Sequence, residues 1–452
     1  MQVTLTVTEG PHLGREFTFC EHDNFIVGRG QHAHFMLPFE DKFFSRLHFL
    51  VEVNPPCCRL VDMGSRNGTR VNGKKVTAAD LKDGDVIRAG LTVIQVSVER
   101  SESDSVVAAP TPPPKPAAIQ PQSELLASTK SYRTQPPSQS TGKCIACGNL
   151  LYTDATPASP KRLCGPCENF ANNHPQSIDG YTLVGELGRG GMGVVYLAVR
   201  EIDNSVTALK TIIPANVGSK RDIALFLREA RILGDLDHRK IVRFREMGDC
   251  NGQLYFAMDY VKGTDAAKLL KEHGPLPIGR AVRLVSDLLE GLAHAHDKGF
   301  VHRDIKPANL LITEEDGREV AKLADFGLAR QYQASRISGL TITGAVAGTV
   351  PFMAPEQITD YRGCKPSVDQ YSAGATLYHL LTRRHPLDFE GSKKHHLVMI
   401  LEDDPVAIQL RRKDIPAILA DIIHRSLLKD PADRFTNAKA MRAALVPFCD
   451  AE

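Results

Sequence analysis

The sequence predicts a multidomain chain in which an all-β sandwich, a small cysteine-bearing segment and a larger α+β unit follow one another. Three observations predict this order. Short alternating segments separated by turn signals occupy roughly the first hundred residues. Two C-x-x-C pairs follow a proline-rich stretch. Beyond them, apolar runs typical of strands give way to apolar residues at helical spacing.

Length and composition narrow the class of protein. A chain of 452 residues is long enough for two or three domains. Its 55 Lys and Arg nearly balance its 53 Asp and Glu, so no general attraction to nucleic acid or to an anionic membrane is expected. No apolar run reaches membrane-spanning length, and the first residues lack the pattern of a signal peptide. We therefore expect a cytoplasmic chain without a membrane span.

The first unit, residues 1–98, shows the pattern of a sandwich. Apolar and polar residues alternate in Met1–Val7 and again in Thr92–Val98, and turn signals such as Asn72-Gly73 lie between. Three motifs occur in order, namely Gly28-Arg29, Ser45-Arg46-Leu47-His48, and the run from Gly64 to Gly73 that contains Arg66-Asn67-Gly68. Together they resemble the forkhead-associated (FHA) domain over essentially the whole unit.

The FHA resemblance implies a loop site that binds phosphothreonine peptides. Arg29 and Ser45 would hold the phosphate, because a guanidinium fork matches its oxygens and a hydroxyl adds a neutral hydrogen bond. Asn67 would bind the peptide backbone, and Arg46 and Arg66 lie where further peptide contacts often arise. The resemblance gives Gly28 and His48 a structural role, in support of the loops.

Residues 99–142 are rich in proline, serine, alanine and threonine, which predicts a disordered linker. Its threonines could be phosphorylated and captured by the FHA domain of the same or another chain, although the composition favours a plain spacer. These threonines are Thr111, Thr129, Thr134 and Thr141.

Residues 143–170 carry the spacing C-x₂-C-x₁₆-C-x₂-C, formed by Cys144, Cys147, Cys164 and Cys167. This spacing is typical of zinc sites, and the segment resembles a zinc ribbon with structural Zn²⁺. Gly148 and Gly165-Pro166 are expected to form the tight turns. Free thiols or two disulfides are the alternatives, and a reducing interior disfavours disulfides. We expect a rigid positioning or protein-docking module, because no basic and aromatic cluster indicates nucleic acid.

The remaining unit, residues 178–447, concentrates charged and amide side chains in His302-Arg303-Asp304-Ile305-Lys306-Pro307-Ala308-Asn309 and in Asp325-Phe326-Gly327. Upstream lie the glycine-rich run from Gly188 to Val195 and Ala208-Leu209-Lys210. This set resembles the protein kinases, and Lys306 two residues after Asp304 resembles the serine/threonine class. The resemblance implies a bilobal α+β fold, with ATP and Mg²⁺ or Mn²⁺ between the lobes.

The kinase resemblance also implies a role for each motif residue. Asp304 would orient the substrate hydroxyl and accept its proton, Lys306 would neutralise the transferring phosphate, and Asn309 and Asp325 would hold Mg²⁺. Lys210 would meet the α- and β-phosphates and pair with Glu229, which lies near the apolar face of a helix predicted over Lys220–Leu236. The nucleotide-contacting positions would be Gly188, Gly190, Gly193, Val195, Met258, Asp259 and Val261.

Other positions would support or regulate the site. Asp369 would brace the catalytic loop, and Glu356 would pair with Arg434. Arg303 before Asp304 is typical of kinases that are switched by a phosphate on the activation loop. The candidate phosphorylation sites are Ser335, Ser338, Thr341 and Thr343, of which position favours Thr341 and Thr343, and Thr349 matches a threonine of the serine/threonine class.

Two functions remain open at the level of sequence. The first is an ATP-dependent protein kinase of the non-specific serine/threonine class, with protein substrates and an FHA domain that binds phosphothreonine partners or the chain's own phosphosites. The second is an adaptor in which the kinase fold only binds. The complete set of Lys210, Asp304 and Asp325 favours the first, because an inactive relative would normally lack one of them.

Overall fold

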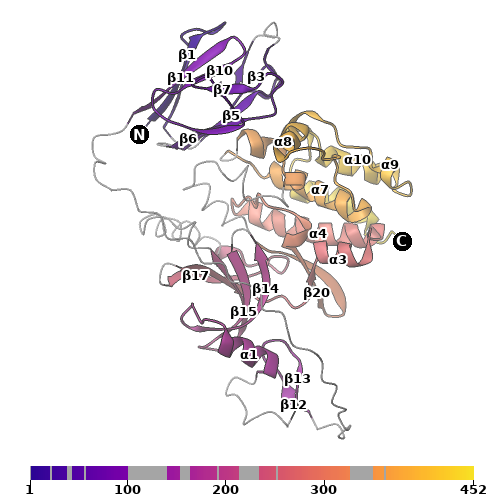
Figure 1. Ribbon diagram of the computed structural model, residues 1–452. Coiled ribbons are helices and arrows are strands. Elements are labelled where there is room, and N and C mark those ends of the chain that lie inside the picture. The colour runs from indigo at the N-terminus through magenta and orange to yellow at the C-terminus, as the bar shows by residue number, and fades with distance from the viewer. Residues whose placement is uncertain are drawn as a thin grey trace, which may run out of the picture.

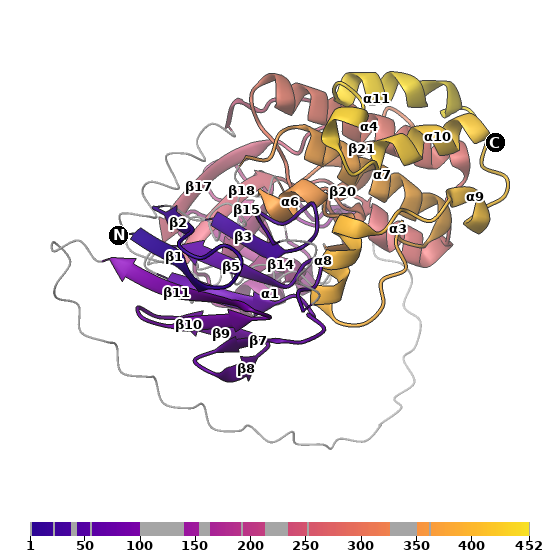
Figure 2. The ribbon, with the colours of Figure 1, turned by 90° about the horizontal axis from the view of Figure 1, so that it is seen from above.

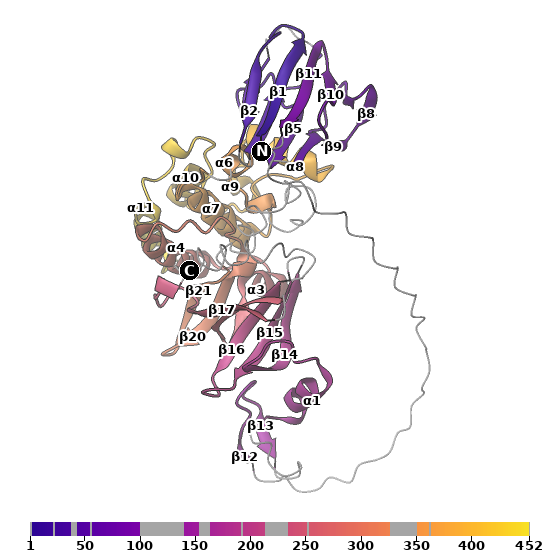
Figure 3. The ribbon, with the colours of Figure 1, turned by 90° about the vertical axis from the view of Figure 1, so that its left-hand side faces the viewer.

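The computed structural model describes residues 2–20, 23–37, 43–54, 57–99, 140–152, 163–190, 193–212, 234–250, 253–325, 350–360 and 363–451. These parts form a row. Figures 1 and 3 show the β-sandwich at one end, then a mainly helical lobe, then a mainly β lobe, and the cysteine-bearing segment at the other end. The predicted fold class is confirmed in all three parts.

The FHA part is a sandwich of two sheets. One sheet has the order β2-β1-β11-β10-β7-β8 and the other has the order β4-β3-β5-β6-β9. Strands pair antiparallel except β3 with β4, and β1 pairs with β11 from Gln2↔Glu99 to Val7↔Ile94. The strands are β1 Gln2–Glu9, β2 Glu16–Phe19, β3 Asp23–Gly28, β4 Phe35–Met36, β5 Phe49–Asn54, β6 Cys57–Asp62, β7 Thr69–Val71, β8 Lys74–Val76, β9 Ala78–Leu81, β10 Val86–Ala89 and β11 Thr92–Glu99.

The cysteine-bearing segment consists of a short hairpin and one helix. Strands β12 (Ser140–Lys143) and β13 (Leu150–Tyr152) pair antiparallel, and helix α1 spans Gly165–Asn173. The sequence prediction of a tight turn at Gly165-Pro166 is wrong, because these residues begin α1. Proline is favoured in a first helical turn, where its missing N–H leaves no bond unmade. Glu99 and Ser140–Gly142, at the two ends of the predicted linker, also belong to strands.

The small lobe is a five-stranded antiparallel sheet of order β14-β15-β16-β18-β17. The apolar run that follows the glycine-rich motif lies in β15. Helix α1 of the cysteine-bearing segment packs beside β14, and Cys144, Cys164 and Cys167 share one buried cluster with Leu197 and Val199 of β15. The strands are β14 Tyr181–Gly190, β15 Gly193–Arg200, β16 Val206–Ile212, β17 Phe244–Cys250 and β18 Gln253–Asp259.

The large lobe is built around helices α4 and α7. Helix α4 has an apolar face at helical spacing, since Val282, Val285, Leu288 and Leu292 are all buried. The helix ends at Asp297, and Gly299 follows with the left-handed backbone that a helix end favours. The helices are α3 Ala266–His273, α4 Ile278–Asp297, α6 Pro355–Thr359, α7 Ser367–Thr382, α8 Lys393–Glu402, α9 Ile408–Arg411, α10 Ala417–Ser426 and α11 Ala438–Leu445.

Short elements complete the large lobe and carry the loop at its centre. A three-stranded sheet contains β19 (Thr264–Asp265), β20 (Leu310–Glu315) and β21 (Arg318–Leu323). The 3₁₀ turns are η3 Pro307–Asn309, η5 Val350–Phe352, η6 Pro431–Asp433 and η7 Val446–Phe448. Viewed from above in Figure 2, strands β3 and β5 of the sandwich lie beside α6 and α8 of this lobe.

Candidate active site and phosphopeptide site

The catalytic loop lies between α4 and β20, and a buried carboxylate braces it. Asp369 sits in the first turn of α7 and is 0% exposed. Its two oxygens accept hydrogen bonds from the backbone N–H groups of His302 and Arg303, each at 2.8 Å, and from His296 Nε2 at 2.8 Å. Burial is the largest single influence and opposes ionisation, but the hydrogen bonds and electrostatic interactions of Asp369 with His296 and His302 together outweigh it, so the pKa of Asp369 lies below its ordinary value. The predicted brace is confirmed.

Within the loop, three predicted residues meet at one carboxylate. Asp304 Oδ2 accepts hydrogen bonds from Lys306 Nζ at 2.9 Å and from Asn309 Nδ2 at 3.2 Å. The same Asn309 nitrogen donates to the backbone oxygen of Asp304 at 2.8 Å. Because the amide nitrogen of Asn309 is engaged in this way, its amide oxygen is the atom available to a cation.

The side chain of Lys210, on β16 of the small lobe, extends to Asp325 of the large lobe. Its Nζ donates to both carboxylate oxygens, at 2.5 and 2.6 Å. Burial is the largest single influence on Asp325 and opposes its ionisation, but the charge and hydrogen bonds of Lys210 together with the charge of Lys306 outweigh burial, so the pKa of Asp325 lies below its ordinary value. Glu229, the predicted partner of Lys210, lies outside the described residues. The described partner is instead the carboxylate expected to hold Mg²⁺.

Backbone strain and a buried histidine join the catalytic loop to Asp325. Arg303 and Asp325 adopt left-handed backbone with φ of 63° and 62°, which is uncommon for non-glycine residues and concentrates at functional sites. His302 Nδ1 accepts from the N–H of Asp304 at 3.2 Å, and Nε2 bonds the oxygen of Ala324 at 3.0 Å. Burial lowers the pKa of His302, and a neutral ring offers the one donor and one acceptor that these bonds need.

Helix α6 supports the loop from the other side through a residue that the sequence prediction missed. Gln357 Oε1 accepts from the N–H of Ala354 at 3.0 Å, and its Nε2 donates to the oxygen of Arg303 at 2.9 Å. The neighbouring Glu356 makes a two-pronged pair with Arg434 at 2.6 and 2.9 Å, which confirms that prediction. The position of Gln357 directly after this glutamate is the only sequence signal that could have indicated it.

The end of β14 and the start of β15 form the glycine-rich hairpin. Gly188 and Gly190 end β14, Gly193 begins β15, and Val195 pairs with Lys210 of β16. A Cβ built on Gly193 would lie 1.7 Å from the oxygen of Thr211, so no other residue fits there. On the next strand, Met258 pairs with Ala208, and Asp259 and Val261 follow toward the large lobe. The predicted nucleotide-contacting residues thus lie on β14, β15, β16 and β18, which are neighbours in the small-lobe sheet, and on the segment that follows β18.

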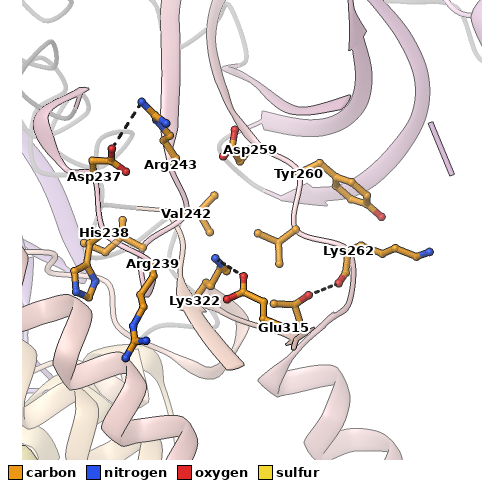
Figure 4. A pocket seen from close by; sticks show the side chains of 13 residues that line it. Asp237, His238, Arg239, Val242, Arg243, Asp259, Tyr260, Lys262, Glu315 and Lys322 are labelled. Carbon is orange, nitrogen blue, oxygen red and sulfur yellow. Dashed lines mark hydrogen bonds and ion pairs between the residues drawn. The ribbon is translucent and has the colours of Figure 1, made fainter. Parts of the chain in front are cut away.

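A pocket of about 450 Å³ lies between residues 237–243, the segment Asp259–Lys262 and strands β20 and β21 (Figure 4). Charges of both signs line it and pair with one another. Arg243 lies 3.8 Å from Asp237, and Lys322 lies 2.7 Å from Glu315. Because these charges largely neutralise one another, the lining selects neither an anionic nor a cationic ligand, and we assign none to it.

The FHA loops bring four of their five predicted residues together. The backbone N–H of Arg29 donates to the oxygen of Ser45 at 3.1 Å, and Ser45 Oγ accepts from the N–H of Arg66 at 3.0 Å. Asn67 Nδ2 donates to the oxygen of Phe43 at 2.7 Å. Arg46 instead extends to the kinase large lobe, where its Nη2 lies 2.8 Å from Glu402 Oε2 in α8.

Buried residues hold these FHA loops in place. The sequence prediction missed Asp62, which ends β6 and accepts from the N–H groups of Gly64 and Ser65 at 3.0 and 2.9 Å. Its second oxygen accepts from the hydroxyls of Ser65 and Thr69 at 2.6 and 2.7 Å. The expected structural role of Gly28 is confirmed, since a Cβ there would lie 2.0 Å from the oxygen of Arg46. His48 is also buried, and its Nδ1 accepts from the N–H of Ser45.

The four cysteines of the two C-x-x-C pairs form one cluster. Their Sγ atoms all lie within 4.8 Å of one another, and Cys147 and Cys164 are 3.5 Å apart. A tetrahedral zinc with Zn–S bonds of about 2.3 Å needs sulfurs roughly 3.8 Å apart, so the cluster fits the ion. Burial raises the pKa of Cys144, but hydrogen bonds from backbone N–H groups outweigh burial and lower it to about 7, whereas burial holds the pKa of Cys164 and Cys167 above the ordinary value. Zinc requires the thiolate form, which the surroundings favour at Cys144.

Several predicted sites lie outside the described residues, and the predictions for them rest on the sequence alone. They are Glu229, the activation-loop candidates Ser335, Ser338, Thr341 and Thr343, the class-typical Thr349, and the linker residues Thr111, Thr129 and Thr134. Among the residues that the structure describes, no helix is both long and apolar enough to cross a membrane.

Comparison with known proteins gives two family matches. The protein kinase domain matches residues 181–446, and the FHA domain matches residues 25–90. Serine/threonine-protein kinase PknD of Mycobacterium tuberculosis is 37% identical over 262 residues, which are 57% of this chain and 38% of PknD. Serine/threonine-protein kinase pkn3 of Myxococcus xanthus is 33% identical over 274 residues, 59% of this chain and 49% of pkn3. The chain therefore spans less than half the length of these two curated relatives.

Solved structures give similarities of lower sequence identity. The kinase domain of Mycobacterium tuberculosis PknI is 28% identical, with a TM-score of 0.48, and the match covers 60% of this chain and 98% of that domain. A structure of Rad53 residues 1–466 in complex with AMP-PNP is 20% identical with a TM-score of 0.49, and the match covers 99% of this chain and all of that one.

Proposed function

We propose, because the chain belongs to the protein kinase family, that it is an ATP-dependent serine/threonine protein kinase whose FHA domain binds phosphothreonine. One observation carries the proposal. The side chains of Lys306 and Asn309 both lie within hydrogen-bond distance of the Asp304 carboxylate, on a loop that Asp369 braces from the buried core. An adaptor that only bound its partners would have no need of this arrangement.

The residues divide the work of phosphoryl transfer. Asp304 orients the attacking hydroxyl and accepts its proton, and Lys306, already 2.9 Å from Asp304, places a positive charge beside the reacting group. Lys210 supplies a second positive charge from the small lobe. The buried carboxylate of Asp369 and the neutral ring of His302 keep the loop fixed, so that little reorganisation accompanies the reaction.

The predicted cofactor positions suit ATP and Mg²⁺. The amide oxygen of Asn309 and the carboxylate of Asp325 are oxygen ligands of the kind that Mg²⁺ prefers. The bound ion would neutralise phosphate charge. The adenine would lie beside Met258, Asp259 and Val261, and the hairpin of Gly188, Gly190 and Gly193 would approach the phosphates.

The FHA rim suits a phosphorylated peptide. The backbone N–H groups of Arg29 and Arg66 bond to Ser45, and Arg29 Nε donates to the oxygen of Phe44 at 2.6 Å. These contacts support a rim that offers positive charge and a hydroxyl to a phosphate. Asn67 lies beside them for the peptide backbone. The ligand would be a phosphothreonine partner or a phosphosite of the chain itself. The four-cysteine cluster would hold a structural Zn²⁺ that fixes its segment on the small lobe.

The kinase proposal is tested by incubating the purified full chain with Mg²⁺ and ATP and mapping new phosphates by mass spectrometry. We expect phosphoserine and phosphothreonine, lost by at least ~10³-fold in Asp304→Asn and Asp325→Ala. Asp316→Asn is the matched control, because Asp316 is an exposed turn residue. Transfer that persists in Asp304→Asn would contradict the assignment. ATP binding without transfer in the wild type would favour the adaptor function.

The FHA proposal has a separate test by fluorescence anisotropy. A degenerate phosphothreonine peptide library should bind the full chain at least tenfold more tightly than the matched phosphoserine library. Arg29→Ala should abolish the difference, whereas Arg15→Ala, which lies outside the three FHA motifs, should preserve it. Equal binding by the wild type and Arg29→Ala would contradict the assigned phosphate site.

A further inference from the structure

The sheet β4-β3-β5-β6-β9 of the FHA sandwich is apolar on both of its faces. Phe25, Val27 and Phe49 point into the sandwich core, whereas Ile26 and Leu50 alternate with them and face away from it. Both of these outward residues are nevertheless 0% exposed. The outward face of such a sheet is ordinarily polar and open to water. We call the outward set, Ile26, Leu47, Leu50, Val61 and Met63, the outer FHA face.

The kinase large lobe covers this face. The outer FHA face forms one continuous buried cluster with residues of η5, α6 and α8. Figures 1 and 2 show the same arrangement, with the sandwich against the end of the lobe that carries α6 and α8. We call the covering residues the large-lobe wall, and they are Val350, Met353, Ile358, Leu397, Ile400 and Leu401.

A charged pair borders the apolar contact. Arg46 Nη2 lies 2.8 Å from Glu402 Oε2, with side-chain exposures of 71% and 8%. An apolar centre with a polar rim is the anatomy of a specific protein interface. Arg46 also belongs to the loop motif proposed to bind phosphopeptides, so the rim of the contact adjoins that site.

The large-lobe wall is adjacent to the catalytic loop. Ile358 follows Gln357, whose side chain holds the backbone oxygen of Arg303 at 2.9 Å, directly before Asp304. A protein substrate must bring its hydroxyl to Asp304, and the residues that flank this hydroxyl need a surface beside the loop. The stretch from Val350 to Ile358 is such a surface, and in this structure the FHA domain occupies its apolar side.

We propose that the outer FHA face is a docking surface for the large lobe of the same chain, and that the docked FHA domain competes with protein substrates for the wall beside the catalytic loop. The occupant is intramolecular because both surfaces belong to one chain, and a tether raises their effective concentration to the millimolar range. The activity part rests on the proposed kinase function, whereas the docking part does not.

The test compares the full-length wild type with Leu50→Asp, which places a charge in the centre of the outer FHA face and leaves the sandwich core unchanged. Val86→Asp is the matched control, because Val86 is an exposed apolar strand residue of the other sheet. Hydrogen exchange measured by mass spectrometry reports docking. We expect Leu50→Asp alone to speed exchange at least tenfold in α8 and in the peptide spanning Val350–Thr359.

Kinase assays then report the consequence of docking. We expect Leu50→Asp to lower KM for a protein substrate at least threefold, with KM for ATP unchanged. Arg46→Glu should act in the same direction, and adding Glu402→Arg should restore the wild-type value. This rescue distinguishes a lost interface from a damaged FHA domain.

Each outcome decides one part of the proposal. Unchanged exchange in α8 in Leu50→Asp, with phosphopeptide binding intact, would overturn the docking surface. Faster exchange with an unchanged KM for protein would overturn the competition with substrate. A wild-type dimer that Leu50→Asp converts to monomer in sedimentation would replace the intramolecular contact by one between two copies. Failure of all phosphoryl transfer would refute the kinase function and leave the exchange result standing.

Discussion

The catalytic loop and the FHA loops are each organised by one buried aspartate, but the two aspartates come from different distances along the chain. Asp62 binds groups two, three and seven residues away, and the loop that it holds contains the exposed residues Gly64 and Arg66. Asp369 binds groups 66, 67 and 73 residues away and is completely buried. A local brace can form with its own loop, whereas the remote brace exists only when the whole large lobe has folded. The two sites should therefore fail in different ways.

The largest effect is expected when the remote brace, Asp369, is removed. Asp369→Ala leaves two buried backbone N–H groups and His296 without their acceptor, so we expect a loss of about 4 kcal/mol of stability. The catalytic loop should also lose its position, with at least ~100-fold lower activity. Urea unfolding and kinase assays measure both. Asp388→Ala, an exposed change in the same lobe, should cost less than ~0.5 kcal/mol.

Removal of zinc from the four-cysteine cluster tests whether a metal site stabilises its surroundings as Asp369 does. Replacing Cys164 and Cys167 by serine should release zinc and loosen the cluster that packs on Leu197 and Val199. We expect the small-lobe unfolding temperature to fall by about 5 °C or more, and KM for ATP to rise several-fold. Metal analysis of the wild type should give one zinc per chain. The exposed Cys20→Ser is the control, and an unchanged melting curve for the double variant would argue against a structural metal.

Acid should destabilise the large lobe through a partly buried histidine, His385. His385 stacks on His379 with ring centroids 4.4 Å apart, and burial lowers its pKa from 6.5 to about 4. A depressed histidine pKa stabilises the fold above pH 6.5, and this contribution is lost as pH falls toward 4. We expect roughly 2 kcal/mol of pH-dependent stability, allowing for partial exposure. Unfolding measured at pH 7 and pH 4.5 should show a smaller difference in His385→Phe.

The smallest effect is expected at the local brace. Asp62→Ala removes the acceptor of four loop donors, but water can reach much of this rim, so the cost should be about 1–2 kcal/mol. Phosphothreonine peptide affinity should fall about tenfold, because Ser45 and Arg66 lose their fixed spacing. Asp80→Ala, an exposed change on the neighbouring strand β9, should leave the affinity unchanged. A greater loss of stability than in Asp369→Ala would reverse the comparison.

The parts of the sites that could be predicted from the sequence are those whose residues lie close together in short motifs. Asp304, Lys306 and Asn309 lie within six residues, so their meeting at one carboxylate follows from the loop itself. The four cysteines likewise fix their own cluster. The bonds that Gln357, Asp62 and Asp369 make to backbone groups leave no pattern of residue types. The kinase resemblance implied the role of Asp369, whereas no resemblance implied a role for Gln357 or Asp62, so these two were missed. The contact of Arg46 with Glu402 could not be predicted, since nothing local indicates which distant surface an arginine reaches.

The outer FHA face left a signal that could have been interpreted. The runs Phe25-Ile26-Val27 and Phe49-Leu50-Val51 are apolar without alternation, which is typical of strands covered on both faces. That pattern indicates that another part of a protein packs on this face, but it does not identify which part. The cover lies far along the chain in η5, α6 and α8, and only the three-dimensional arrangement identifies it. Sequence therefore predicts each domain well and their contact poorly.

The position of that cover has a consequence during synthesis. The FHA sandwich leaves the ribosome first, while the residues from Val350 to Leu401 follow only after the small lobe, roughly tens of seconds later at ordinary translation rates. During this interval Ile26, Leu50 and Val61 form an uncovered apolar patch on an otherwise finished domain. Such a patch attracts chaperones or other nascent chains. The yield of the intact protein should thus depend on chaperone supply more strongly than that of a Leu50→Asp variant.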